Sequence, residues 1–155
     1  MKLSKETRYG LGGLIALAKK PPGTVMLLND IAAAENLPRF FLAKTFQKLT
    51  QHGVLRSHRG AIRGYALAHP PREIKLRQIL EAIEGPDLLG RCIFWSEYCS
   101  ESDPCPLHYR WKSMSKPLKA ALLRETLEDL AKGSASRRKA PARRAGRVVR
   151  GGKKG

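Results

Sequence analysis

Three cysteines and a histidine are the residues whose types and spacing point most directly to chemistry in this 155-residue chain. Six residues separate Cys92 from Cys99, five separate Cys99 from Cys105, and His108 follows Cys105 after two. The chain has no further cysteine, and Ser, Glu, Asp and Pro surround these three. Structural cysteines usually scatter among apolar core residues, so a cluster in a polar loop predicts a metal site.

The types of ligand leave the metal open. Three thiolates and an imidazole suit a tetrahedral zinc ion, and cysteines, sometimes with histidine, also bind iron–sulfur clusters. The lack of a closely spaced cysteine pair weighs against a zinc finger, and a wide polar loop would let oxidants or gases reach a cluster. His108 is either the fourth ligand or an exposed histidine at the start of a helix.

The balance of charge predicts a polyanionic partner. The formal net charge is +17, from 30 Lys and Arg against 13 Asp and Glu, which makes nucleic acid the leading candidate. Residues 133–155 hold nine of the basic residues and no acid, leaving +8 on residues 1–132. No phosphate-binding glycine loop or paired nucleophile and base is present in the sequence, so we do not expect an enzyme.

The sequence also predicts where the protein resides. No apolar stretch approaches the roughly 18 residues that crossing a bilayer requires, so we expect no membrane contact. Basic residues before the run 11–18 superficially resemble a secretory signal, but Glu6 lies among them and glycines interrupt the run. An odd number of cysteines suits a reducing cytosol better than a disulfide framework. We therefore expect a cytoplasmic protein.

Apolar periodicity and capping residues predict the elements that position these groups. A first helix runs from Ser4 to about residue 19, a short one spans 30–36 with Asn29 as its cap, and Pro38 starts another over 38–49. Two short helices joined by a tight connection outline a helix-turn-helix.

Extended segments complete this unit. Residues 54–58 and 64–68 flank a turn at 60–63 and predict a hairpin, which beside a helix-turn-helix forms a wing. An amphipathic helix is predicted over 74–83, and it leads straight into the cysteine loop.

The C-terminal third is helical in pattern up to residue 132, with a break or kink at Pro117. Its leucine stripe consists of Leu118, Leu122, Leu123, Leu127 and Leu130. Nothing else in the chain is long enough to cover this stripe, so we favour a homodimer contact over packing onto the first helix. Residues 133–155 carry too little apolar surface to fold, which predicts a disordered basic tail.

Two basic surfaces predict contact with double-stranded DNA. The helix over 38–49 should bury Leu42, Phe46 and Leu49. Its opposite face carries Arg39, Ala43, Lys44, Gln47 and Lys48, and the hairpin carries Arg56, His58, Arg59 and Arg63. Arg bridges guanine edges, Gln pairs with adenine and Lys neutralises phosphate when such a helix lies in a major groove, while a wing approaches the backbone or minor groove. A charged helix face alone is ordinary surface, but helix and wing together predict DNA binding.

Several motifs follow one another in a recognisable order between residues 1 and 132. They are Met1-Lys2-Leu3-Ser4-Lys5, Arg8-Tyr9, Asp30-Ile31-Ala32, Leu37-Pro38, Phe41-Leu42, Gln47-Lys48-Leu49, Gly53-Val54-Leu55, Arg59-Gly60, Gly64-Tyr65, Cys92, Cys99, Cys105-Pro106-Leu107-His108 and Trp111. In this order the chain resembles the IscR and NsrR family of bacterial iron–sulfur transcriptional regulators.

The resemblance implies a homodimer that binds a partly palindromic operator and holds a cluster through Cys92, Cys99, Cys105 and a fourth ligand. In the IscR branch a histidine after the third cysteine completes a two-iron (2Fe–2S) cluster, and His108 occupies that position; a four-iron (4Fe–4S) cluster is the alternative. In the nitric-oxide-sensing branch a carboxylate of the first helix serves instead, but Arg8 stands there in this chain.

The chain departs from the family pattern in two places. Ala61, Ile62 and Arg63 replace a glycine-rich wing tip, and the first cysteine gap has six residues rather than the usual five. The first departure bears on minor-groove contact and operator preference, and the second on the type and stability of the cluster.

We expect a mainly α protein with a small β-hairpin wing, a winged helix-turn-helix plus a long dimerisation helix. Residues 1–70 would form the DNA-binding domain, residues 71–132 the cluster-binding loop and dimerisation helices, and residues 133–155 the tail. Functionally we expect a cluster-sensing repressor or dual regulator, in which loss, oxidation or nitrosylation of the cluster shifts a dimer between two DNA-binding forms through the helix over 74–83. The competing hypothesis is an architectural DNA-binding protein with a zinc-stapled or metal-free loop.

Overall fold

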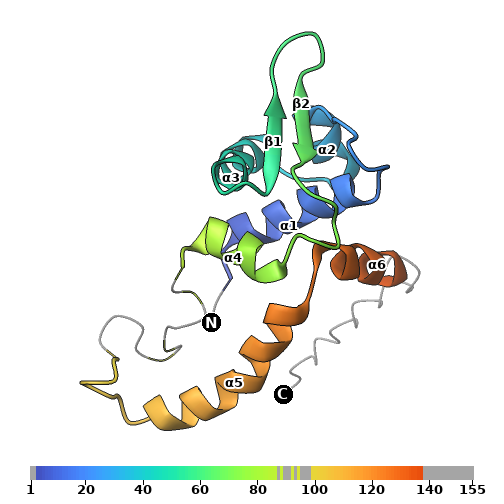
Figure 1. Ribbon diagram of the computed structural model, residues 1–155. Helices are drawn as coiled ribbons and strands as arrows, with labels where there is room; N and C mark the ends of the chain where they lie inside the picture. The colour runs from blue at the N-terminus through green and yellow to red at the C-terminus, as the bar shows by residue number, and fades with distance from the viewer. Residues whose placement is uncertain (1–2, 87, 89–91, 93, 95–98, 138–155) are drawn as a thin grey trace, which may run out of the picture.

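The computed structural model describes residues 3–86, 88, 92, 94 and 99–137. Within these residues the chain forms six helices and one antiparallel hairpin (Figure 1). In chain order the elements are α1 (Lys5–Ala18), α2 (Leu28–Ala34), α3 (Arg39–Gln51), β1 (Leu55–His58), β2 (Gly64–Leu67), α4 (Leu76–Glu84), α5 (His108–Arg124) and α6 (Leu127–Arg137). The predicted mainly α fold with a small hairpin wing is confirmed. None of the described helices is long and apolar enough to span a membrane.

The helix starts follow the predicted capping at two of three positions. The side-chain oxygen of Ser4 accepts a hydrogen bond from a backbone amide of the first turn of α1 (3.2 Å), and Pro38 directly precedes α3. The prediction that Asn29 caps α2 was wrong, because the amide of Ile31 already donates to the Leu27 carbonyl (3.1 Å). Asn29 therefore lies inside the first turn of α2.

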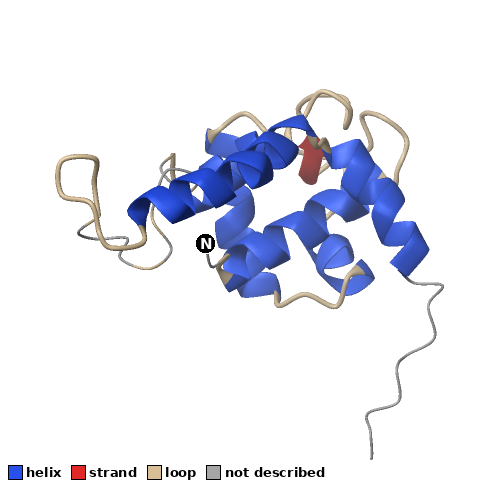
Figure 2. Ribbon diagram, turned by 90° about the horizontal axis from the view of Figure 1, so that it is seen from below, coloured by secondary structure: helices blue, strands red, loops and turns tan. Residues whose placement is uncertain are grey.

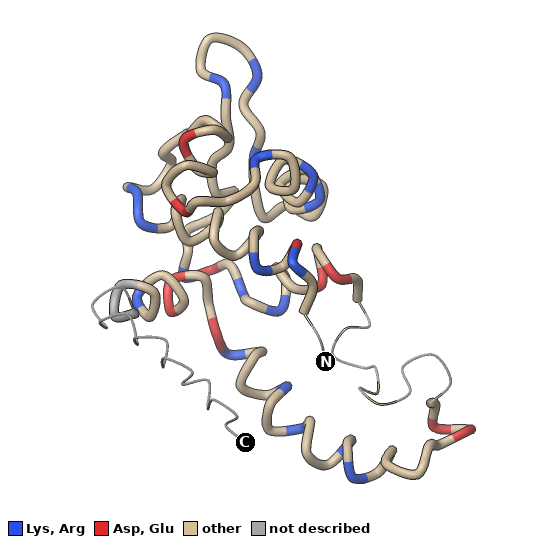
Figure 3. Tube along the Cα trace, turned by 180° about the vertical axis from the view of Figure 1, so that it is seen from behind, with Lys and Arg blue, Asp and Glu red and all other residues tan. Residues whose placement is uncertain are grey.

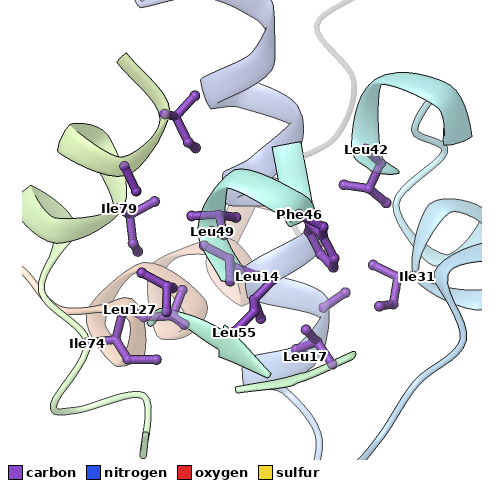
Figure 4. Packing of buried hydrophobic residues seen from close by; sticks show 14 of the residues in the cluster. Leu14, Leu17, Ile31, Leu42, Phe46, Leu49, Leu55, Ile74, Ile79 and Leu127 are labelled. Atoms are coloured by element: carbon purple, nitrogen blue, oxygen red, sulfur yellow. The ribbon is translucent and has the colours of Figure 1, made fainter. Parts of the chain in front are cut away.

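The core lies where α1 crosses α3, and α4 and α6 close it (Figure 4). Leu42, Phe46 and Leu49 of α3 are fully buried, which confirms the predicted inward face. The other elements contribute Leu14 of α1, Leu55 of β1, Ile79 of α4 and Leu127 of α6. A Cβ atom at Gly13 would lie only 2.7 Å from the Phe46 ring, so glycine at this position allows α1 to approach α3 closely.

The C-terminal helical segment is interrupted at a different place from the one predicted. Helix α5 continues through Pro117, and the break falls at Glu125 and Thr126. The chain is extended there because it forms two backbone hydrogen bonds of 2.9 Å with residues 74–76, which lead into α4. The Thr126 hydroxyl then accepts a hydrogen bond from the Asp129 amide (3.2 Å) and caps α6.

This break divides the predicted leucine stripe. Leu127 is fully buried in the core, whereas Leu118 and Leu123 of α5 keep 44% and 41% of their surface exposed. In α6 the stripe therefore contributes Leu127 to the intramolecular core, as in the alternative prediction, whereas Leu118 and Leu123 of α5 stay exposed. Helix α5 extends away from the bundle toward the cysteine loop (Figure 2), and the wing projects from the opposite end of the molecule (Figure 1).

Helix α6 passes the predicted start of the basic tail. It continues to Arg137, so residues 133–137, which the sequence analysis assigned to the tail, belong to this helix. Helix α6 packs against α1, a contact that the composition of the tail does not reveal. The remainder of the predicted tail, residues 138–155, lies outside the described residues.

Candidate DNA interface and metal centre

A concave groove of about 1000 Å³ lies between the outer face of α3, the start of α2 and the wing. Six of the eight residues predicted to bind DNA line it: Arg39, Lys44 and Gln47 from α3, and His58, Arg59 and Arg63 from the wing and its turn. Lys and Arg positions mark both the wing and α3 in Figure 3. The fold therefore brings the two basic surfaces of the sequence to one groove.

The charged groups of this groove all have the same sign. Arg39, Lys44 and Gln47 are exposed, and none of the residues lining the groove, all of which the structure describes, is acidic. Duplex DNA carries one negative charge per about 1.7 Å of its axis. The groove therefore offers a favourable electrostatic surface to a duplex.

Two residues predicted to bind DNA lie outside the groove. Arg56 is exposed on β1 opposite Ala66 but does not line the concave surface. The ammonium nitrogen Nζ of Lys48 lies 2.6 Å from Oε2 of Glu6 in α1. Lys48 is thus engaged with a carboxylate and joins α3 to α1.

The base of the wing is held firmly against the helices. Tyr65 and Met26 exchange two backbone hydrogen bonds of 2.9 and 3.0 Å, and the Tyr65 ring meets Phe46 edge to face with centroids 5.1 Å apart. At Gly64, where φ is +146°, a Cβ atom would come within 2.2 Å of the Met26 carbonyl oxygen. Glycine at this position therefore sets the angle of the wing, whose tip carries Ile62 with 70% of its surface exposed.

The four predicted metal ligands meet where the cysteine loop enters α5. The Sγ atoms of Cys92, Cys99 and Cys105 lie within 4.8 Å of one another, and Nδ1 of His108 is 3.0 Å from Sγ of Cys99. A turn closed by a hydrogen bond from the His108 amide to the Cys105 carbonyl (2.9 Å) places the imidazole beside the sulfurs. Three sulfurs and one imidazole nitrogen form a donor set that fits zinc or an iron–sulfur cluster.

A metal at this centre must displace protons. Burial raises the pKa of the Cys105 thiol above its ordinary value; hydrogen bonds with Cys99 and Cys92 add to this effect, and a backbone hydrogen bond from Leu107 opposes it. Because the thiolate is the form that binds metal, loading the centre releases this proton.

The second ring nitrogen of His108 faces Glu101. Nε2 is buried, it has no hydrogen-bond partner among the described residues, and it lies 3.5 Å from Oε1 of Glu101. The same oxygen accepts a hydrogen bond from Nζ of Lys112 (2.5 Å). This hydrogen bond lowers the pKa of Glu101 below its ordinary value, although desolvation opposes it.

Sequence analysis missed one further connection, between the end of α4 and the start of α1. Glu84, the last residue of α4, accepts hydrogen bonds from the Ser4 amide (2.8 Å) and from the hydroxyl of the fully buried Thr7. Burial would raise the pKa of Glu84, but hydrogen bonds with Ser4 and Thr7 outweigh that effect and lower it. The one local signal is the place of Glu84 directly before Gly85, where the helix ends and the loop to Cys92 begins.

Known proteins resemble this chain along most of its length. The Rrf2 family model, described as an iron-dependent transcriptional regulator, matches residues 3–133. The HTH-type transcriptional regulator CymR of Bacillus subtilis is 34% identical over 131 residues, which cover 84% of this chain and 90% of CymR.

Solved structures agree with that result. The structure of CymR, the global cysteine regulator of B. subtilis, has a TM-score of 0.72 at 32% identity and covers 86% of this chain and 98% of that one. The structure of T. potens IscR has a TM-score of 0.69 at 26% identity and covers 92% of this chain and 94% of that one. These regulators share the winged-helix fold, and the family is one of transcriptional regulators and not of enzymes, which confirms both predictions.

Proposed function

This chain belongs to the Rrf2 family of helix-turn-helix transcriptional regulators, and we propose that its affinity for operator DNA depends on an iron–sulfur cluster. The observation that carries this proposal is the meeting of the three cysteine sulfurs, all within 4.8 Å, with an imidazole nitrogen 3.0 Å from one of them. The similarity to T. potens IscR and the description of the family as iron-dependent favour iron over zinc.

The ligands of the proposed centre are Cys92, Cys99 and Cys105 as thiolates and His108 as a neutral imidazole. Histidine ligands occur in two-iron clusters such as Rieske centres, so a ligand set that includes His108 leads us to favour a two-iron (2Fe–2S) over a four-iron (4Fe–4S) cluster. When bound, the cluster would make the protein sensitive to oxidants, to nitric oxide and to the supply of iron. The cluster persists only while all three thiolates stay deprotonated and close together, so loss of any one of them would release the cluster.

In the proposed DNA complex, α3 enters the major groove. Arg39 and Gln47, which line the groove, would then face base edges, where Arg can form paired hydrogen bonds with guanine and Gln with adenine. Lys44 neutralises phosphate, and Arg59 and Arg63 of the wing reach the backbone or the adjacent minor groove.

The regulator acts as a homodimer in this proposal, with α5 as the contact helix. Met114 and Leu118 of α5 keep 69% and 44% of their surfaces exposed, and they lie four residues apart, on one face of the helix. An apolar face of this kind is typical of a protein–protein contact. Two copies related by a twofold axis present two α3 helices, which suits a partly palindromic operator with half-sites roughly 34 Å apart.

A chain of contacts joins the metal centre to the DNA-contacting helix. The loop that carries Cys92 starts directly after Glu84, which holds the start of α1 through Ser4 and Thr7. One residue before Thr7, Glu6 pairs with Lys48 of α3. A change in the loop that displaces Glu84 therefore alters the support of α3. The resulting effect on DNA binding is limited to the difference in affinity with which DNA binds the two arrangements.

Anaerobic purification followed by a DNA-binding titration tests the proposed function. We expect a coloured protein with acid-labile sulfide, and an operator affinity that changes when the cluster is removed. A colourless protein with stoichiometric zinc, or equal DNA affinity with and without the cluster, would contradict the proposal and favour the architectural alternative.

Substitutions sharpen this test. Replacing Cys92, Cys99 or Cys105 by Ala should abolish the visible absorbance, while the exposed Ser113→Ala on α5 serves as a matched control and should keep it. If a variant keeps the full spectrum, the cysteine that it lacks is not a ligand of the cluster.

A further inference from the structure

The buried Nε2 of His108 is a polar atom that the proposed ligand set does not explain. It has no hydrogen-bond partner among the described residues, and the side chain as a whole is only 12% exposed, so water has little access to it. A buried polar nitrogen without a partner is uncommon, since each one costs free energy unless some group satisfies it. In a histidine that binds metal through one nitrogen, the other usually donates to a carboxylate, a carbonyl or a water.

Glu101 is placed to provide that carboxylate. Its Oε1 lies 3.5 Å from Nε2 of His108, slightly longer than a hydrogen bond, and its side chain is 69% exposed and has room to rotate. Lys112 follows His108 by one helical turn, so both side chains lie on one face of α5. Its Nζ bonds the same Oε1 at 2.5 Å and keeps the carboxylate near the edge of the ring.

We propose that Glu101 is a positioning residue of the metal centre: its carboxylate accepts the Nε2 hydrogen of His108, which turns the free electron pair of Nδ1 toward the three sulfurs. Lys112 holds the carboxylate in place for this contact. With Glu101 present, one tautomer of the imidazole prevails and the ring is oriented before metal binds. Without it, the ring distributes between tautomers and orientations, and only a part of the molecules offers Nδ1 to the centre.

This inference rests on the proposed function for its meaning, but part of its test does not. The first measurement is nitrogen NMR of histidine-labelled, reduced, metal-free full-length protein, with the His108 signal assigned by its absence in His108→Ala. We expect the tautomer with hydrogen on Nε2 in the wild type and a mixture in Glu101→Ala. Glu101→Gln keeps an acceptor oxygen and should restore the wild-type tautomer.

The second measurement follows the cluster in anaerobically purified protein. Loss of a partner outside the ligand set typically weakens metal binding about 10–100-fold, so Glu101→Ala should lose its cluster to a chelator faster by that order. Pulsed EPR of the reduced, nitrogen-labelled protein should show one strongly coupled histidine nitrogen in the wild type and a changed coupling in the variant. Asp103→Asn, in the same loop, is the matched control and should behave as the wild type.

The outcomes separate the two hypotheses. A wild type without a cluster whose His108 tautomer still depends on Glu101 overturns the proposed function and keeps the positioning role. A cluster whose retention and nitrogen coupling do not respond to Glu101→Ala, with an unchanged tautomer, overturns the positioning role and leaves the proposed function standing.

Discussion

The ammonium nitrogen of Lys48 lies 2.6 Å from a carboxylate oxygen of Glu6, and this ion pair joins α3, the helix proposed to contact DNA, to α1. Both side chains are partly exposed, so the pair contributes about 0–1 kcal/mol to the free energy of unfolding. Its importance lies in what it does to the charge at the DNA-binding surface. While the pair is formed, Lys48 is not available to a phosphate.

Glu6→Gln should therefore strengthen DNA binding without sequence preference. Freeing Lys48 for one more phosphate contact should steepen the dependence of log K on log salt by up to about 0.9. Salt titrations of binding to a random duplex measure this change. Glu35→Gln adds the same net charge but disturbs a different ion pair, with Lys19, and should have a smaller effect; equal slopes for the two variants would show that only net charge matters.

Glu84→Gln should destabilise the fold at neutral pH and flatten its dependence on acid. The pKa of Glu84 is lower in the folded protein than in the unfolded chain, so its stabilising contribution is present above the ordinary carboxyl range and disappears as pH falls through the folded pKa. The substitution should cost about 1 kcal/mol near pH 7 and less in acid, since the hydrogen bonds involve a charged but partly exposed group.

Denaturant unfolding of the metal-free protein at pH 7 and pH 4 measures this effect. Glu81→Gln, one turn earlier in α4 and paired with Arg77 at the surface, is the control and should change stability little. If both variants lose stability equally at both pH values, the contacts of Glu84 with Ser4 and Thr7 do not matter for folding. We also expect Glu84→Gln to weaken the response of DNA affinity to loss of the cluster.

Substitutions in the groove should divide by the part of DNA that each residue contacts. Gln47→Ala should lose about 1–3 kcal/mol of discrimination at one base pair of each half-site. Lys44→Ala should weaken all sequences alike and reduce the salt slope by about 0.9. Competition binding with a panel of operator variants measures both, and Arg56→Ala, outside the groove, is expected to change neither.

Gly64→Ala should damage the wing more than Gly60→Ala does. Both glycines have positive φ, +146° and +125°, so an alanine is strained at either place, by about 1–3 kcal/mol. Only at position 64 would the new Cβ also clash with the Met26 carbonyl. Thermal unfolding and operator binding should both show the difference. Identical unfolding midpoints for the two variants would mean that the wing base can move away from the Met26 carbonyl at little cost.

Met114→Glu combined with Leu118→Glu should dissociate the proposed dimer, because the two exposed residues lie on one face of α5 and each change places a charge there. We expect the dimer dissociation constant to rise at least tenfold, which corresponds to about 1.4 kcal/mol. Analytical ultracentrifugation measures the change, and binding to an isolated half-site should persist. Ile62→Glu changes an exposed apolar residue on the wing tip and should leave the oligomeric state unaltered.

The parts of this fold that follow local rules could be predicted from the sequence. The Ser4 cap, the inward face of Leu42, Phe46 and Leu49, and the hairpin all depend on neighbours within a few residues. Local rules were wrong where distant segments compete with them. The break after α5 falls at Glu125 because residues 74–76 bond to the chain there, and Pro117 is tolerated within the helix.

The candidate site shows the same division. Cysteine spacing indicated the candidate metal centre, since the proposed ligands lie within 17 residues of one another, from Cys92 to His108. The bonds from Glu84 to Ser4 and Thr7 join residues 80 and 77 positions apart, which no periodicity can link. Lys48 was predicted to bind DNA because of its position on the outer face of its helix. Only the folded chain shows that Lys48 forms an ion pair with Glu6.

The break at Glu125 and Thr126 gives α5 the properties of a lever arm. The helix has 17 residues, a length of about 25 Å at 1.5 Å per residue, with His108 at its far end and the hydrogen bonds to residues 74–76 at its pivot. A tilt of roughly 10° at the pivot would carry the far end through about 4 Å over a helix of that length. By the same ratio, moving His108 by an ångström or two would turn α5 by only a few degrees about its pivot. If α5 forms the proposed dimer contact, the relative orientation of the two subunits would change by a similar angle, so an operator with a strictly fixed half-site spacing would respond most strongly.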